Sequence, residues 1–131
     1  MYSSPQIAKA RDQYRSTALA SRIEGSGPHG LVTLLYEELS RSLEVVALCM
    51  ERDQNAVSRP HVDRARSILL ALEAGLDFQQ GAGLALQLPG IYRAMRTELQ
   101  RCLDTKDVDG MAKLRQGLTD IAASWADIAA R

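Results

Sequence analysis

The stretch LVTLLYEELSRSLEVVALCMER, residues 31–52, decides the fold class. Its apolar side chains recur in alternating steps of four and three residues. Because an α-helix repeats every 3.6 residues, this spacing places them on one helical face. The face consists of Val32, Tyr36, Leu39, Leu43, Val46 and Met50. The sequence therefore predicts a helix from Leu31 to about Arg52 whose apolar seam packs against other helices.

Three further seams with the same periodicity follow along the chain. They run through Val62, Ala65, Leu69, Leu72 and Leu76; through Leu84, Leu88, Ile91, Met95, Leu99 and Cys102, with Tyr92 and Leu103 adjoining; and through Met111, Leu114, Leu118, Ile121, Trp125 and Ile128. Short connections make consecutive helices antiparallel neighbours. No window shows the alternation typical of a strand. We expect an all-α protein, an antiparallel up-down four-helix bundle.

The segments between the seams contain turn and helix-start signals. RDQNAVSRP, residues 52–60, is polar, and it predicts an N-cap at Ser58 with Pro60 inside the first turn of the next helix. Gly81 and Gly83 can end that helix and turn the chain. Pro89 falls where a continuous helix would have to kink, or where a short helix gives way to a longer one.

The amino-terminal part differs from the rest. Residues 1–24 are polar and carry only a thin apolar stripe at Ile7, Ala10, Tyr14 and Ala18. Such a stripe predicts a weak amphipathic helix that needs a surface to dock on. EGSGPHG then breaks the chain, and Pro28 suits a first helical turn. We expect an amino-terminal helical arm, residues 1–24, and a helical bundle domain, residues 28–131.

Composition narrows the class of protein. The 131 residues suit a single domain, and 16 basic residues balance 16 acidic ones. This balance argues against nucleic-acid binding, which favours a basic excess. Cys49 and Cys102 lack metal-ligand spacing and predict two buried, reduced thiols. With neither a signal peptide nor an apolar run of about 20 residues, the chain is expected to be cytoplasmic, without membrane insertion.

Residues that could carry chemistry are sparse. His29 lies in a glycine- and proline-rich turn and His61 at a helix start, and no nucleophile motif accompanies either residue. No Glu-x-x-His pair of a di-metal bundle occurs. Gly81 and Gly83 lack the strand and helix of a phosphate-binding loop. The sequence predicts a protein without enzymatic activity, cofactor or metal.

Apolar surface, in contrast, exceeds what one seam can use. Outside the seam of residues 31–52 lie Leu31, Leu34, Leu35, Val45 and Leu48. A wide core face explains any one of them. Together they indicate either a hydrophobic groove that a partner fills or a homodimer face. The arm, through Ile7 and Tyr14, is the candidate cap of such a groove.

Five motifs in order resemble the flagellar secretion chaperone FliS family. They are YRSTALASRI in the arm, GPHGLVTLLYEEL, LEAGLDFQQGAGLALQL, IYRAMRTEL, and LRQGLTDIAASWADI in the last helix. The likeness extends roughly from Gln13 to Ile128. Two departures stand out: Gly27 replaces the serine that usually precedes Pro-His, and Pro89-Gly90 interrupts a segment where relatives continue a helix.

The resemblance implies a cytosolic bundle that binds the disordered carboxy-terminal segment of flagellin. Such a chaperone prevents premature polymerisation and aids delivery to the flagellar type III export gate; a co-chaperone is left open. Matched motif positions imply a flagellin-binding groove formed by Leu31, Tyr36, Leu76, Phe78, Leu88, Tyr92 and Met95. The family also implies that the arm occupies part of this surface in the free state.

Two other hypotheses remain open from the residues alone. The surplus leucines could make a self-associating helical bundle, a structural or adaptor protein, and the oligomeric state is left as a monomer or a weak homodimer. A histidine phosphotransfer domain acting through His61 is the enzyme-class alternative, but Pro60 and VDRARS around His61 match such domains poorly.

Overall fold

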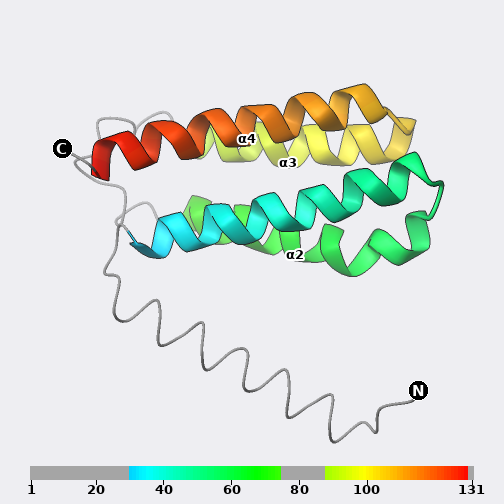
Figure 1. Cartoon of the computed structure of the whole chain (residues 1–131), viewed down its shortest axis with the longest axis horizontal. Helices are drawn as coiled ribbons and strands as arrows, with labels where there is room; N and C mark the ends of the chain where they lie inside the picture. Colours follow the sequence, from blue (N-terminus) through cyan, green and yellow to red (C-terminus); the bar gives the residue numbers. More distant parts are fainter. Residues whose placement is uncertain (1–29, 75–87, 130–131) are drawn as a thin grey trace, which may run out of the picture.

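The computed structural model describes residues 30–74 and 88–129, and they form an antiparallel bundle (Figure 1). The first helix, residues 30–51, is cyan to teal in Figure 1. It is followed by α2 (Asn55–Ala74), α3 (Leu88–Thr105) and α4 (Val108–Ala129). The described residues contain no strand. The expected all-α four-helix bundle is confirmed, whereas the arm of residues 1–24 lies outside the described residues.

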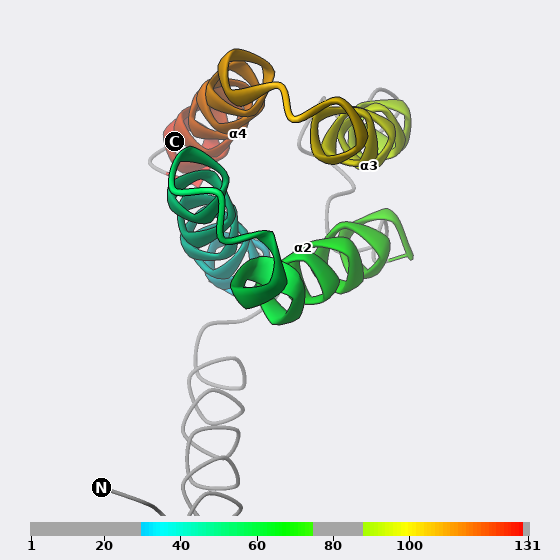
Figure 2. The same cartoon turned by 90° about the vertical axis from the view of Figure 1, so that its right-hand side faces the viewer.

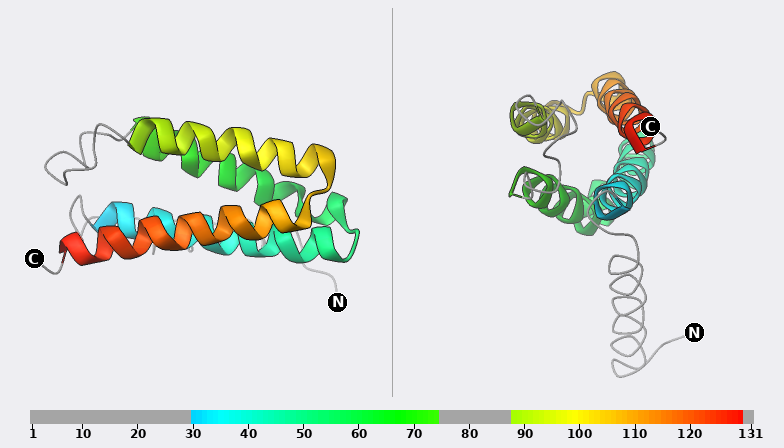
Figure 3. Two further views of the ribbon diagram at one scale, coloured as in Figure 1. Left: turned by 90° about the horizontal axis from the view of Figure 1, so that it is seen from above. Right: turned by 90° about the vertical axis from the view of Figure 1, so that its left-hand side faces the viewer.

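The helices lie at the corners of a four-sided bundle when viewed along their axes (Figure 2). Consecutive helices are neighbours and run in opposite directions, and α4 returns beside the first helix (Figure 3). The first helix and α3 therefore face each other across the diagonal. The short connections at residues 52–54 and 106–107 require the two helices that each of them joins to run in opposite directions.

The four seams form one core. Its fully or nearly fully buried members include Leu39, Leu43, Val46, Ala65, Leu69, Leu72, Leu88, Tyr92, Leu99, Cys102, Met111 and Leu118. Met50, Ile91 and Ile121 are half-buried at its edge. Cys49 and Cys102 are free thiols and both are buried, as the sequence predicts. Every seam residue whose side chain the structure describes is thus at least half-buried. The seam residues Leu76 and Leu84 and the Ile128 side chain lie outside the described part.

Two helices end in the same tight turn although neither turn contains glycine. After the first helix, Gln54 N–H donates to the Cys49 carbonyl at 2.7 Å and Asp53 N–H to the Met50 carbonyl at 3.2 Å, with Asp53 at φ 55°. After α3, Asp107 N–H donates to the Cys102 carbonyl at 2.9 Å, with Lys106 at φ 53°. A helix end with a left-handed residue and these reversed bonds is a Schellman motif.

The predicted N-cap at Ser58 is wrong, because α2 already begins at Asn55. The Schellman turn at Asp53 returns the chain to helical conformation at once, and Val57 N–H donates to the Gln54 carbonyl at 3.0 Å. Pro60 consequently lies inside α2. Pro89 behaves differently: α3 begins at Leu88, so Pro89 falls in a first turn, where a missing amide hydrogen is tolerated.

Candidate functional site

A cluster of aromatic side chains occupies one end of the core. Tyr36 on the first helix and Tyr92 on α3 share a hydrogen bond between their hydroxyls at 2.7 Å, across the diagonal of the bundle. Trp125 on α4 meets Tyr36 edge to face, with ring centroids 6.4 Å apart. Burial raises the pKa of Tyr36, and the Tyr92 hydroxyl partly offsets that rise. The hydrogen bond between the two buried hydroxyls therefore ties opposite helices together.

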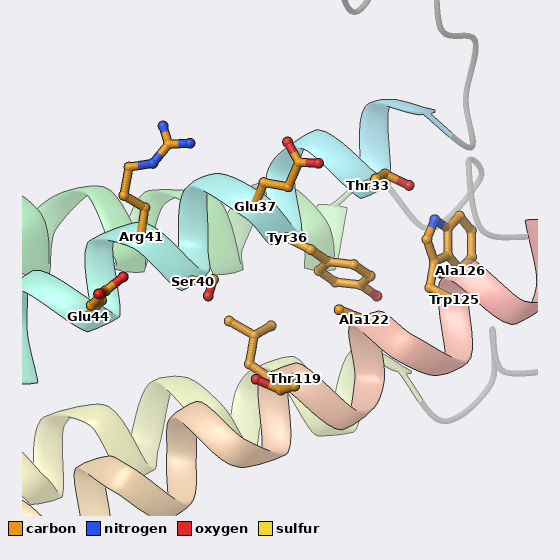
Figure 4. A pocket seen from close by; sticks show the side chains of 11 residues that line it. Thr33, Tyr36, Glu37, Ser40, Arg41, Glu44, Thr119, Ala122, Trp125 and Ala126 are labelled. Carbon is orange, nitrogen blue, oxygen red and sulfur yellow. The ribbon is translucent and has the colours of Figure 1, made fainter.

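The Tyr36 hollow opens above this cluster, between the first helix and α4 (Figure 4). Its volume is about 510 Å³, which is in the range of ordinary ligand pockets. Tyr36, Leu118, Ala122 and Trp125 contribute the apolar side chains of the hollow. Polar and small side chains complete it: Thr33, Glu37, Ser40, Arg41, Glu44, Thr119 and Ala126.

The hollow exists because small side chains line both helices where they approach each other. Ser40 on the first helix and Ala122 and Ala126 on α4 are too short to fill the space between the helix backbones. Leu118 and Trp125 are buried beneath them. An amphipathic helix could place a large apolar side chain in this space without displacing the core.

A second depression, the Met95 hollow, lies between α3 and α4 and has a volume of about 410 Å³. Its lining is mainly apolar: Ile91, Ala94, Met95, Leu114 and Ile121, with Glu98 and Lys113 as charged members. Gly110 and Gly117 of α4 also line it. A Cβ added at Gly117 would meet nothing within 4 Å, so the backbone of α4 is open to a partner there.

The predicted groove residues that the structure describes fall into three groups. Tyr36 and Met95 each line one of the two hollows, although their own side chains are mostly buried. Leu88 and Tyr92 are only 1 % and 0 % exposed and are core residues, so a client could touch them only if the bundle opened. Leu31 is half-buried. Leu76, Phe78, Ile7 and Tyr14 lie outside the described residues.

The surplus apolar residues of the first helix differ in how far they are buried. Leu34 is buried, Leu35 and Val45 are half-buried, and Leu48 is 43 % exposed. None of them lines either hollow. A wide core face therefore accounts for most of the excess on this helix.

Comparison with known proteins identifies the family. The family model described as "Flagellar protein FliS" matches residues 10–131. The chain belongs to the FliS family.

Two curated relatives agree with this assignment. The chain is 25 % identical over 117 residues to "Flagellar secretion chaperone FliSB" of Pseudomonas aeruginosa, covering 89 % of this chain and 93 % of that protein. It is 24 % identical over 116 residues to "Flagellar secretion chaperone FliS" of Salmonella typhimurium, covering 88 % and 86 % respectively. These names describe chaperones, a class whose role is binding and not catalysis.

In this FliS family member, the hollows depend on residues that the sequence pattern did not single out. These residues are the small ones beside a seam: Ser40, Gly117, Ala122 and Ala126. Hydrophobic periodicity is read from large apolar side chains, so it assigns small residues neither to the core nor to the surface. The signal that could have found them is the recurrence of small residues on α4, at Gly117, Ala122 and Ala126. Within the described residues no helix is long and apolar enough to cross a membrane, and no group of side chains could hold a metal ion.

Opposite the Tyr36 hollow, α2 and α3 are joined by an ion-pair clamp. Glu73 accepts hydrogen bonds from Arg93 Nε at 3.2 Å and from Arg96 Nη2 at 2.9 Å. Partial burial raises the pKa of Glu73, but the two arginines outweigh it and bring the pKa below its ordinary value. The clamp keeps the end of α2 beside the start of α3. A hollow of about 400 Å³ between these two helices has a more polar lining, with Ser58, Arg59, Asp63 and Arg66 among its members.

Proposed function

We propose that this protein is an export chaperone that binds the carboxy-terminal segment of flagellin in the cytoplasm. It keeps that segment from polymerising early and aids its delivery to the flagellar type III export gate. The observation that carries the proposal is the family match over residues 10–131 together with two open hollows along α4. A helix laid along α4 could place apolar side chains in either.

The energetics suit reversible capture of a disordered segment. Burial of about 1,000 Å² of apolar surface contributes on the order of 25 kcal/mol before any losses. Folding of the client into a helix and loss of free motion offset most of it. The surplus is enough to hold a client and small enough to permit release at the export gate, and no covalent step is required.

The proposed contacts follow from the motif positions that match the family. Tyr36 and Met95 contribute the walls of the two hollows, with Leu88 and Tyr92 supporting them from the core. We retain Leu31, Leu76 and Phe78 as proposed direct contacts. Residues 1–24, through Ile7 and Tyr14, are proposed to cover this surface when no client is bound.

Light scattering and calorimetry with a flagellin carboxy-terminal peptide test the function. We expect a monomer that forms a one-to-one complex. A dimer that ignores the peptide would instead favour the self-associating bundle.

A matched pair of substitutions tests the place of binding. Ala126→Asp puts a charge into the Tyr36 hollow from an exposed position, and Ala123→Asp puts the same charge on exposed α4 surface outside both hollows. We expect Ala126→Asp to weaken the complex by about tenfold, or about 1.4 kcal/mol, and Ala123→Asp to change it little. Equal effects of the two would place the client elsewhere.

A further inference from the structure

Charge is divided unequally between the two sides of the bundle. The first helix carries four glutamates and one arginine, and α4 carries three aspartates, one lysine and one arginine. On the opposite side, α2 and α3 together carry six arginines against four acidic residues. The helices on the side of the Tyr36 hollow therefore carry a net charge of −4, and those on the opposite side carry +2.

The acidic character is concentrated at the Tyr36 hollow itself. Glu37 and Glu44 are exposed, line the hollow, and lie two helical turns apart on the first helix. Glu44 has no ion-pair or hydrogen-bond partner among the described residues. Arg41 lies between them, but its guanidinium donates to Glu38 at 2.8 Å, and Glu38 does not line the hollow. This cation is therefore paired with a carboxylate that lies outside the hollow.

The Met95 hollow lacks such an excess of negative charge. Glu98, its only carboxylate, is held by hydrogen bonds from Arg101, which keep the pKa of Glu98 below its ordinary value. Lys113 adds a positive charge to the same lining. The two hollows thus offer similar apolar space in different electrostatic surroundings.

We propose that the Tyr36 hollow selects an amphipathic helical segment of the client whose apolar stripe is flanked by lysine or arginine. This inference rests on the proposed function and specifies which part of a client lies between the first helix and α4. The apolar side chains enter the hollow over Tyr36, Ala122 and Trp125. The flanking cations lie along the first helix, where they meet Glu37 and Glu44.

The apolar and the charged side chains of the Tyr36 hollow contribute differently to binding. Apolar burial supplies most of the affinity, because the carboxylates are exposed and an exposed ion pair changes a binding constant by only about twofold to fivefold. The charges set orientation, speed up association, and disfavour acidic segments of equal hydrophobicity. Binding to this hollow should accordingly weaken as salt concentration rises.

Two designed peptides test the selection on the full-length protein. They share one apolar helical stripe and differ only in having lysine or glutamate on its flanks. At low salt we expect calorimetry to show at least about tenfold tighter binding of the lysine peptide. The ratio should fall toward one as salt is raised. Equal affinities at low salt, or no binding of either peptide, would overturn the proposal.

Charge reversal at two sites of the first helix separates a local effect from net charge. Glu44→Lys acts at the hollow, whereas Glu51→Lys makes the same change two turns away, about 10 Å along the helix and outside the hollow. That separation exceeds the screening length of about 8 Å at physiological salt. We expect Glu44→Lys to weaken lysine-peptide binding about fivefold and Glu51→Lys to leave it within about twofold. If both substitutions weakened binding to a similar extent, the proposal that Glu37 and Glu44 act locally at the hollow would be refuted.

The outcomes also keep this inference apart from the proposed function. Binding of the flagellin peptide that is insensitive to Glu44→Lys and to salt leaves the chaperone function standing and removes the charge selection. Selective binding of the lysine peptide without binding of the flagellin peptide supports the selection and removes flagellin as the client.

Discussion

Gly110 and Gly117 lie two turns apart on α4 and meet opposite surroundings. A Cβ on Gly110 would lie 2.5 Å from Asp107 Oδ2 and 2.8 Å from Arg101 Nη2. Gly110 N–H also donates to Asp107 Oδ1 at 2.8 Å, which makes the close approach part of the helix cap. A Cβ on Gly117 would meet nothing within 4 Å. Only at Gly110 do the neighbouring atoms leave no room for a Cβ.

Alanine substitution at these two positions should therefore differ in its effect on stability. Gly117→Ala should raise the free energy of unfolding by about 0.5–1 kcal/mol, because alanine restricts the unfolded chain and favours the helix. Gly110→Ala displaces the capping carboxylate and should be about 1 kcal/mol or more less favourable than Gly117→Ala. Urea unfolding measures both, and equal gains would contradict the role of Gly110.

At the scale of elements, Asp107 ends one helix and starts the next. Its amide closes the Schellman turn of α3, and its carboxylate accepts the Gly110 amide at the start of α4. Arg101 of α3 donates to the same carboxylate at 2.8 Å. The Gly110 amide first, and Arg101 second, keep the pKa of Asp107 below its ordinary value. One side chain thus connects two antiparallel helices.

This connection should depend on pH in a definite direction. Because the pKa of Asp107 is lowered by folding, its contribution to stability is present above the ordinary aspartate value of about 3.9. It is lost as pH falls through the lower pKa of the folded state. The stability difference between the natural protein and Asp107→Asn should therefore shrink from about pH 7 to about pH 3 in urea titrations. Asp109→Asn, in the same first turn of α4, is the control, and a pH-independent difference at Asp107 would disprove the connection.

Helices were easier to predict from the sequence than their ends. Seams with steps of three and four residues determine which face is buried, and this pattern placed the first helix within one residue of its observed ends. The turn at residues 52–54 was misread because Asp53 adopts a left-handed conformation without being glycine. Polar residues before Pro60 resemble a longer loop, so the predicted cap at Ser58 falls three residues after Asn55, the first residue of α2.

At the scale of the whole molecule, the candidate site was predictable only in part. Tyr36 and Met95 were expected at the binding surface and line the two hollows, but the same periodicity that identifies them also identifies the buried Leu88 and Tyr92. A hollow arises where side chains are short on two helices at once. Whether two such positions meet depends on how the first helix and α4 are placed in space. The sequence of either helix alone therefore does not predict the hollow.

The proposed role of the amino-terminal arm leads to a kinetic prediction. If residues 1–24 cover the binding surface, only the uncovered fraction of molecules can accept a client, and the apparent affinity is reduced by that fraction. Deleting residues 1–24 should speed association with a flagellin peptide several-fold in biosensor measurements while the melting temperature changes little. Loss of binding after the deletion would instead make the arm a contact surface.

The packing of Trp125 has a practical consequence. It is the only tryptophan of the chain, and its indole contacts Tyr36 at the base of the Tyr36 hollow. The tryptophan fluorescence of the protein therefore comes from the place where a client is proposed to sit. Emission wavelength and quenching by small solutes can follow occupancy of that place directly, without any attached dye.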